Sequence, residues 1–239
     1  SLTNKILFPF TPTIFIGEIS LNLATLTNPM ILRKISNIYK FLLIIEIMVK
    51  VIFRHSHSYD KLYKDIYGYK NYPTEKEIVS YIKNIQKIWA KLENKILKEL
   101  ENVSKLRFKE GKIICYVIGK AIPFSDPLTI PIYKEEPNYF IDTLIHELIH
   151  ILFTQEGNLN KAKKLWRYIF RKYKNETFET KIHIPLHAVH THIYTVFFSM
   201  ERLEHDIIEL FNLRAYRRSW EIVNKDGYQN IINEFTKRI

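Results

Sequence analysis

Residues 139–153 read YFIDTLIHELIHILF and contain neither proline nor glycine. Apart from a few polar side chains the run is apolar all round, which predicts a helix buried on nearly every side. His146 and His150 stand four residues apart, so they project from one face of that helix, one turn from each other. Burying them without a compensating partner is costly. The stretch therefore predicts two hydrogen-bonded core histidines or, as we favour, two ligands of one metal ion.

Glu147, which directly follows the first histidine, adds a candidate base to the two candidate metal ligands. Neutral imidazole is a good zinc ligand, and a zinc ion with three protein ligands and one open position acidifies its bound water. Glu147, beside the first histidine, is placed to take the proton of that zinc-bound water. The sequence therefore predicts a zinc-dependent hydrolase that cleaves peptide bonds.

The motif His146-Glu147-Leu148-Ile149-His150 between bulky apolar residues resembles the active-site helix of the zincin metallopeptidases. The similarity covers residues 112–205. It implies a strand before the helix, often an edge strand along which substrate binds, and a backing helix behind the sheet. Residues 128–133, LTIPIY, fit that strand, and Pro131 suits only an edge or irregular strand.

The same comparison separates two zincin subclasses. Metzincins require a glycine and a third histidine where this chain has Phe153 and Glu156. The resemblance is therefore gluzincin-like, and it implies a third zinc ligand from a later helix.

Residues 183–210, HIPLHAVHTHIYTVFFSMERLEHDIIEL, form the one later segment with enough donors. Pro185 fits the first turn of a helix. His183 joins the polar stripe of that helix if the helix starts early. The other members of the stripe are His187, His190, Tyr194, Glu201 and His205.

We rank the candidates for the third ligand as His187 first, His183 second and Glu201 third. The histidines cluster at the predicted helix start, and no gluzincin Asn-Glu-x-x-x-Asp signature surrounds Glu201. Stripe members that do not bind metal are natural donors to an oxyanion. His190 and Tyr194 are predicted for that role, beside the catalytic base Glu147.

Composition predicts a mostly α-helical fold, and the zincin resemblance implies an α+β, zincin-like arrangement with a small mixed sheet, a backing helix and the active-site helix. The chain of 239 residues is 46% hydrophobic, with Gly 6 and Pro 9, which suits a helix-rich core. Residues 1–58 are predicted as an N-terminal helical region and residues 59–239 as the zincin-like catalytic domain, unless both form one continuous domain. In the first region, residues 41–53, FLLIIEIMVKVIF, predict a buried helix with Glu46 paired to Lys50.

Local signals predict the remaining elements. Residues 56–73 are polar and rich in tyrosine, which predicts a connector, and Thr74 and Glu77 form a capping box that opens a helix reaching residue 103. The later predictions are a hairpin over 106–118 that turns at Glu110-Gly111, a basic amphipathic helix over 158–173, and two short helices in 214–239 broken at Asp226-Gly227.

Cysteine usage and hydropathy predict a cytoplasmic protein. The single Cys115 excludes a disulfide within one chain, and it sits in an apolar run typical of a core residue. Residues 6–26 lack the basic start and cleavage site of a signal peptide. Residues 41–53 are too short and too charged to span a membrane, so we expect no transmembrane segment.

The formal net charge is +11. It favours solubility and acidic partners, including acidic sequences in a peptide or protein substrate. It also keeps a second hypothesis open, a basic helical protein that binds nucleic acid or protein and carries a structural or inactive zinc site. No recognised nucleic-acid motif accompanies the charge, but aromatic residues interleave with arginine at Trp166-Arg167-Tyr168 and Arg217-Arg218-Ser219-Trp220.

Overall fold

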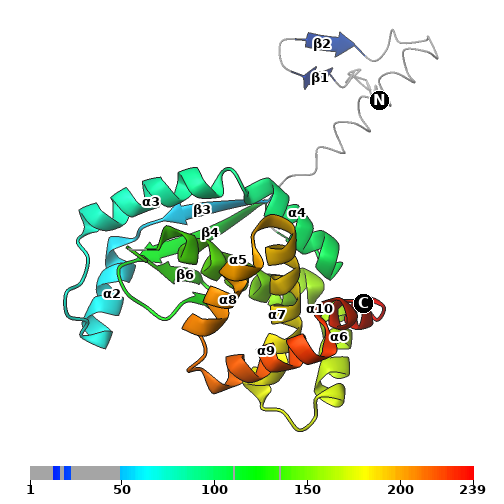
Figure 1. Cartoon of the computed structure of the whole chain (residues 1–239). Coiled ribbons are helices and arrows are strands. Elements are labelled where there is room, and N and C mark those ends of the chain that lie inside the picture. Colours follow the sequence, from blue (N-terminus) through cyan, green and yellow to red (C-terminus); the bar gives the residue numbers. More distant parts are fainter. Residues whose placement is uncertain (1–12, 17–18, 23–48, 110, 135) are drawn as a thin grey trace, which may run out of the picture. The chain divides into compact units, whose positions relative to one another are not determined.

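A computed structural model describes residues 13–16, 19–22, 49–109, 111–134 and 136–239 (Figure 1). The chain divides into two compact units, Ser1–Met48 and Val49–Ile239. In the first unit, β1 (Thr13–Ile16) and β2 (Ile19–Asn22) pair antiparallel, with Thr13 opposite Asn22. Residues 41–48 of the predicted N-terminal helix, including Glu46, lie outside the described residues. We predicted a boundary after residue 58, but the first unit ends at Met48.

The second unit contains a four-stranded mixed sheet in the order β3-β4-β6-β5. The strands are β3 (Lys50–Arg54), β4 (Lys112–Ile118), β5 (Phe124–Ser125) and β6 (Leu128–Pro131). The pairs β3–β4 and β4–β6 are parallel, and β5–β6 is antiparallel. Helices make up most of the described chain, so the predicted α+β class with a small mixed sheet is confirmed.

Residues 50–54, which we predicted as the end of a helix, form the strand β3 instead. Val51 and Phe53 are buried while Lys50 and Arg54 are exposed, an alternation that fits a strand. The parallel partner β4 lies about sixty residues later in the chain, so the residues around β3 could not predict this pairing. Lys50 belongs to this strand, whereas Glu46, its predicted helical partner, lies outside the described residues.

The predicted connector 56–73 contains the helix α2 (His57–Tyr67), which ends at Gly68 with φ 57°. Its apolar and aromatic residues recur at helical spacing, at Tyr59, Leu62, Tyr63, Ile66 and Tyr67, but none of them is buried. Contacts between aromatic side chains one helical turn apart contribute to the stability of α2. The ring centroids of Tyr59 and Tyr63 lie 5.1 Å apart, and those of Tyr63 and Tyr67 lie 5.6 Å apart.

The predicted helix 74–103 is two helices, α3 (Glu75–Trp89) and α4 (Glu93–Ser104). Its start is confirmed, because Thr74 and Glu77 form the reciprocal capping box. The break follows from Glu93, whose Oε1 accepts hydrogen bonds from Trp89 Nε1 at 3.0 Å and from the backbone N–H of Val51 at 2.7 Å. The junction of the two helices is thereby bonded to β3.

The hairpin predicted over 106–118 is wrong. β4 is its only described strand, and both neighbours of β4 are parallel to it. β6 was predicted as an edge strand, but it lies between β4 and β5. Pro131 is tolerated there because β5 pairs only with Leu128 and Thr129, so the position of its missing N–H lies beyond the end of β5.

The helix predicted from residues 139–153 is α5 (Pro137–Thr154), and twelve of its residues are buried. It contacts β5 and β6 on the sheet and also α3, α6 and α7. Figure 1 shows α5 between the sheet and the helices that follow it in sequence. Burial on every side explains the apolar run that surrounds its histidines.

The C-terminal half is helical. The basic helix predicted over 158–173 and the break at Asp226-Gly227 are confirmed. The elements are the 3₁₀ turn η2 (Glu156–Asn158), α6 (Leu159–Lys172), α7 (Phe178–Phe197), α8 (Met200–Glu209), α9 (Arg214–Asp226) and α10 (Tyr228–Thr236). No helix of the described residues is long and apolar enough to cross a membrane.

The single helix predicted over 183–210 is wrong at both ends. α7 begins earlier, where the Thr177 side chain accepts from the Thr180 N–H, so Pro185 lies inside the helix and not in its first turn. α7 ends at Phe197, and the Ser199 side chain caps α8 by accepting from the Arg202 N–H. This break removes Glu201 from the helix that carries the histidines.

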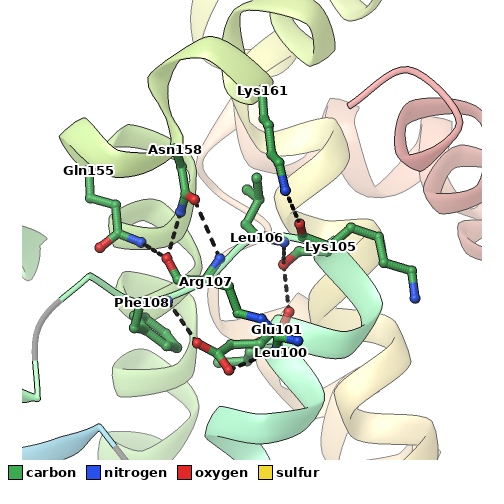
Figure 2. A network of polar contacts seen from close by, with 10 residues as sticks. Leu100, Glu101, Lys105, Leu106, Arg107, Phe108, Gln155, Asn158 and Lys161 are labelled. Carbon is green, nitrogen blue, oxygen red and sulfur yellow. Dashed lines mark hydrogen bonds and ion pairs between the residues drawn. The ribbon is translucent and has the colours of Figure 1, made fainter. Parts of the chain in front are cut away.

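A polar network fixes the C-terminal end of α5 (Figure 2). Asn158 donates through Nδ2 to the carbonyls of Leu152 and Arg107, both at 2.9 Å, and its Oδ1 accepts from the Arg107 N–H at 3.4 Å. Glu101 on α4 accepts from the Phe108 N–H at 2.8 Å. The extended segment after α4 is therefore bonded to the end of the helix that carries the histidine motif.

We predict that Asn158→Ala lowers the free energy of unfolding by about 1–3 kcal/mol, because it leaves buried backbone groups without partners. Urea denaturation of both proteins measures the change. Asn160→Ala is the matched control, since Asn160 is exposed and its loss costs under about 0.5 kcal/mol. Equal effects of the two substitutions would contradict the role of the network.

Candidate metal centre

Three histidines from two helices face one another. His146 and His150 lie on α5 with ring centroids 5.0 Å apart, and His183 on α7 lies 5.5 and 5.3 Å from them. One ring nitrogen of each lies within 4.8 Å of the others. Zinc with bonds of about 2.0–2.1 Å in tetrahedral geometry needs nitrogens roughly 3.3 Å apart. The nitrogens would have to approach one another by up to about 1.5 Å to reach that geometry.

A hydrogen bond to one ring nitrogen of His183 leaves the other nitrogen free to bind a metal ion. Its Nδ1 lies 2.8 Å from the backbone carbonyl of Glu179. A carbonyl only accepts, so Nδ1 carries the proton and Nε2 keeps its lone pair. That Nε2 is buried and has no hydrogen-bond partner among the described residues. A backbone carbonyl that fixes the tautomer in this way is common behind zinc-bound histidines.

Burial keeps these imidazoles neutral. It lowers the pKa of His146 well below its usual value, and the neighbouring histidines lower it further. Burial and His183 lower the pKa of His150 to about 3. Metal binding requires the unprotonated nitrogen, so near pH 7 these rings would release no proton on binding a cation. The donor set therefore fits a zinc ion.

His187, our first choice from the sequence, lies beside this cluster and not within it. Its ring centroid is 5.9 Å from that of His146, and its ring stacks on Trp220 at 3.9 Å. Ser219 Oγ donates to the Tyr216 carbonyl and lies 2.6 Å from His187 Nδ1, so that nitrogen donates to Ser219. The buried Nε2 of His187 is unprotonated and has no described partner. His187 is the obvious fourth nitrogen if the rings shift.

Glu201, our third choice, is exposed in the first turn of α8. It belongs to no metal-compatible group among the described residues. His205 is exposed as well. The stripe that we predicted on one continuous helix is therefore divided between the buried α7 and the surface of α8.

Glu147 lines a cavity of about 210 Å³ together with His146, His190 and Tyr216. Its side chain is buried, and this burial raises its pKa to about 8. A cation bound by the adjacent histidines would favour the ionised carboxylate and so lower that pKa. Glu147 therefore lies at the cavity beside the histidine cluster, where a bound cation would keep it ionised.

The two predicted oxyanion donors are placed differently. His190 on α7 lines the same cavity, and both of its ring nitrogens lack a hydrogen-bond partner among the described residues. Tyr194, one turn later, is fully buried and is not among the lining residues. Its ring centroid lies 4.9 Å from that of His190. The Tyr194 ring therefore packs against the His190 ring, and of these two residues only His190 lines the cavity.

Four residues of this site were not predicted from the sequence. Asp142 on α5 is buried and accepts from Arg202 on α8, with Nη2–Oδ1 at 2.7 Å. Asp206, one turn after Arg202, lies with Oδ2 3.9 Å from His190 Nδ1, and burial raises its pKa to about 7. Tyr216 on α9 lies parallel to His146, with centroids 5.7 Å apart. The spacing of Asp142 and His146, one helical turn, was the one local signal.

Comparison with known proteins yields no match. No family model, curated protein or solved structure is similar to the chain. The case for a function therefore depends on the site itself.

If this cluster holds zinc, His183→Ala should lower the zinc content at least tenfold, as His146→Ala and His150→Ala should. His187→Ala should keep close to one equivalent. Metal analysis after dialysis against a weak chelator measures the content. His192→Ala is the control on the same helix, because His192 bonds Glu99 away from the cluster. Zinc retained by His183→Ala and lost by His187→Ala would restore the sequence ranking.

Proposed function

We propose that the chain is a zinc-dependent peptidase of the zincin type, with His146, His150 and His183 as the metal ligands. One observation carries the proposal. Three neutral imidazoles converge from α5 and α7, and one of them, His146, lines a cavity that the buried carboxylate of Glu147 also lines. A zinc ion with three protein ligands keeps one position open, as catalytic sites do.

Zinc in this cluster would acidify a water molecule and polarise a substrate carbonyl. The Glu147 carboxylate accepts the proton of the attacking water and then delivers it to the leaving amine nitrogen. Neutral His190 carries one N–H, and neither ring nitrogen has a described partner, so it can donate to the oxygen that becomes negative. Burial strengthens this donation because little water competes for the oxygen.

A substrate can reach these groups from the surface. Tyr133 and Tyr139 line both the cavity and a neighbouring groove of about 430 Å³. The cavity itself has room for about one side chain, since its volume of about 210 Å³ is small for a ligand pocket. A peptide lying in the groove would place one residue beside the histidine cluster.

His187 supports a second candidate function, the basic binding protein with a structural zinc site. Its unpartnered Nε2 lies beside the three-histidine cluster, and a fourth nitrogen would close the coordination sphere. A closed site leaves no position for water and has no need for a base. The buried Glu147 at the cavity favours the peptidase.

Glu147→Gln separates these two functions. We expect the variant to keep its fold and its zinc, and to lose peptide hydrolysis by a factor on the order of 10² to 10⁴, because the amide cannot accept the proton. Hydrolysis of casein and of unstructured peptides at neutral pH, with and without a chelator, measures the effect.

Glu204→Gln is the matched control, since Glu204 is exposed on α8. It should leave hydrolysis unchanged. Full activity in Glu147→Gln would contradict the mechanism. A wild-type protein that binds zinc through four histidines and hydrolyses none of these substrates would support the structural-zinc alternative.

A further inference from the structure

The charge around the cavity is opposite to that of the whole chain. The chain carries a net charge of +11. Among the described residues, however, the cavity is lined by three carboxylates, Asp142, Glu147 and Asp206, and by no lysine or arginine. Two more carboxylates, Glu136 and Glu209, line the neighbouring groove. The one lysine of that groove, Lys134, is paired with Glu77 on α3.

Among the described residues, one of the three cavity carboxylates has a hydrogen-bonded counter-charge. Asp142 forms a bidentate pair with Arg202, whose Nε lies 3.0 Å from Oδ1 and 3.1 Å from Oδ2. Glu147 lies next to His146 in the motif, where a zinc ion would balance it. Asp206 is the remaining carboxylate, and it is only 5% exposed.

Among the described residues, no hydrogen bond reaches the Asp206 side chain. Its one ion-pair contact is His190 Nδ1, at 3.9 Å, which is too long for a hydrogen bond. A buried carboxylate without donors is costly, and a cationic ligand would remove that cost.

The neighbours of Asp206 in the cavity wall suit such a ligand. Tyr133 and Tyr139 lie edge to face with centroids 4.7 Å apart, and both border the cavity and the groove. Aromatic faces attract ammonium and guanidinium groups. Leu210 and Leu213 add apolar wall for the methylene part of a long side chain.

We infer that the cavity is a subsite for a cationic group of the substrate, with Asp206 as the residue that binds it. The inference rests on the proposed peptidase function for its substrate, a peptide. The cation is an ammonium or guanidinium group, which an arginine or lysine side chain or a free amino terminus can supply. Basic peptides are thus favoured at this site, although the surface as a whole attracts acidic ones.

A ligand without a peptide bond tests the subsite apart from catalysis. Butylguanidinium and the neutral butylurea have nearly the same shape and differ in charge. Calorimetry on the zinc-loaded protein should show butylguanidinium binding at least tenfold more tightly, as expected for a hydrogen-bonded charge pair. In Asp206→Asn this difference should disappear.

Glu204→Gln is the matched control, because Glu204 lies on the same helix as Asp206 but is exposed. It should preserve the preference for butylguanidinium. Thermal unfolding verifies that Asp206→Asn folds, and Asp206→Glu, which keeps the charge, should retain part of the preference. Equal binding of the two probes to the wild-type protein, or an unchanged preference in Asp206→Asn, would overturn the inference.

Peptide pairs identify the source of the cation. Arginine against citrulline tests the side chain, and a free against an acetylated amino terminus tests the α-amine. A preference of at least tenfold in kcat/KM for one charged member, lost in Asp206→Asn, supports the subsite and assigns its ligand. Binding of butylguanidinium with no hydrolysis of any peptide would contradict the peptidase and support the subsite. Hydrolysis without a charge preference would overturn the subsite and leave the peptidase intact.

Discussion

His146, His183, His187 and His190 are buried where α5 packs against α7, and each has lost hydration that other groups must replace. Burial lowers the pKa of all four, which keeps the rings neutral and their lone pairs available. The surrounding helices complete the arrangement. Ser219 and Trp220 on α9 hold the ring of His187, and the Glu179 carbonyl holds that of His183.

Elements whose signal is local were predictable from the sequence. The capping box at Thr74, the buried helix around the histidine motif and the break at Asp226-Gly227 depend on neighbouring residues alone, and all three are present. β3 was mistaken for a helix because its partner β4 is distant in the chain. α2 was missed because its helical spacing consists mainly of tyrosines within a polar segment that we interpreted as a connector.

The candidate site likewise combines residues that local spacing predicts with residues that only the fold brings together. The spacing of His146 and His150 on one helix brings them together, as we predicted. The ranking of His187 above His183 depended on where α7 begins and on a continuous helix as far as Glu201. The cap at Thr177 and the break after Phe197 change both conditions. Asp206 and Tyr216 reach the cavity from α8 and α9, and no sequence spacing connects them to the motif.

The pair between Asp142 and Arg202 has a consequence for how such a site can diversify. Arg202 fixes α8 against α5, and Asp206 follows it by one helical turn, so the pair also sets the depth at which Asp206 faces the cavity. The proposed metal ligands lie on α5 and α7, whereas Asp206 and Leu210 belong to α8 and the segment after it. Substitutions in that segment would alter which residue is accepted and leave the reacting groups in place. In the proposed peptidase, part of the selectivity would thus depend on a stretch of the chain that carries none of the proposed metal ligands.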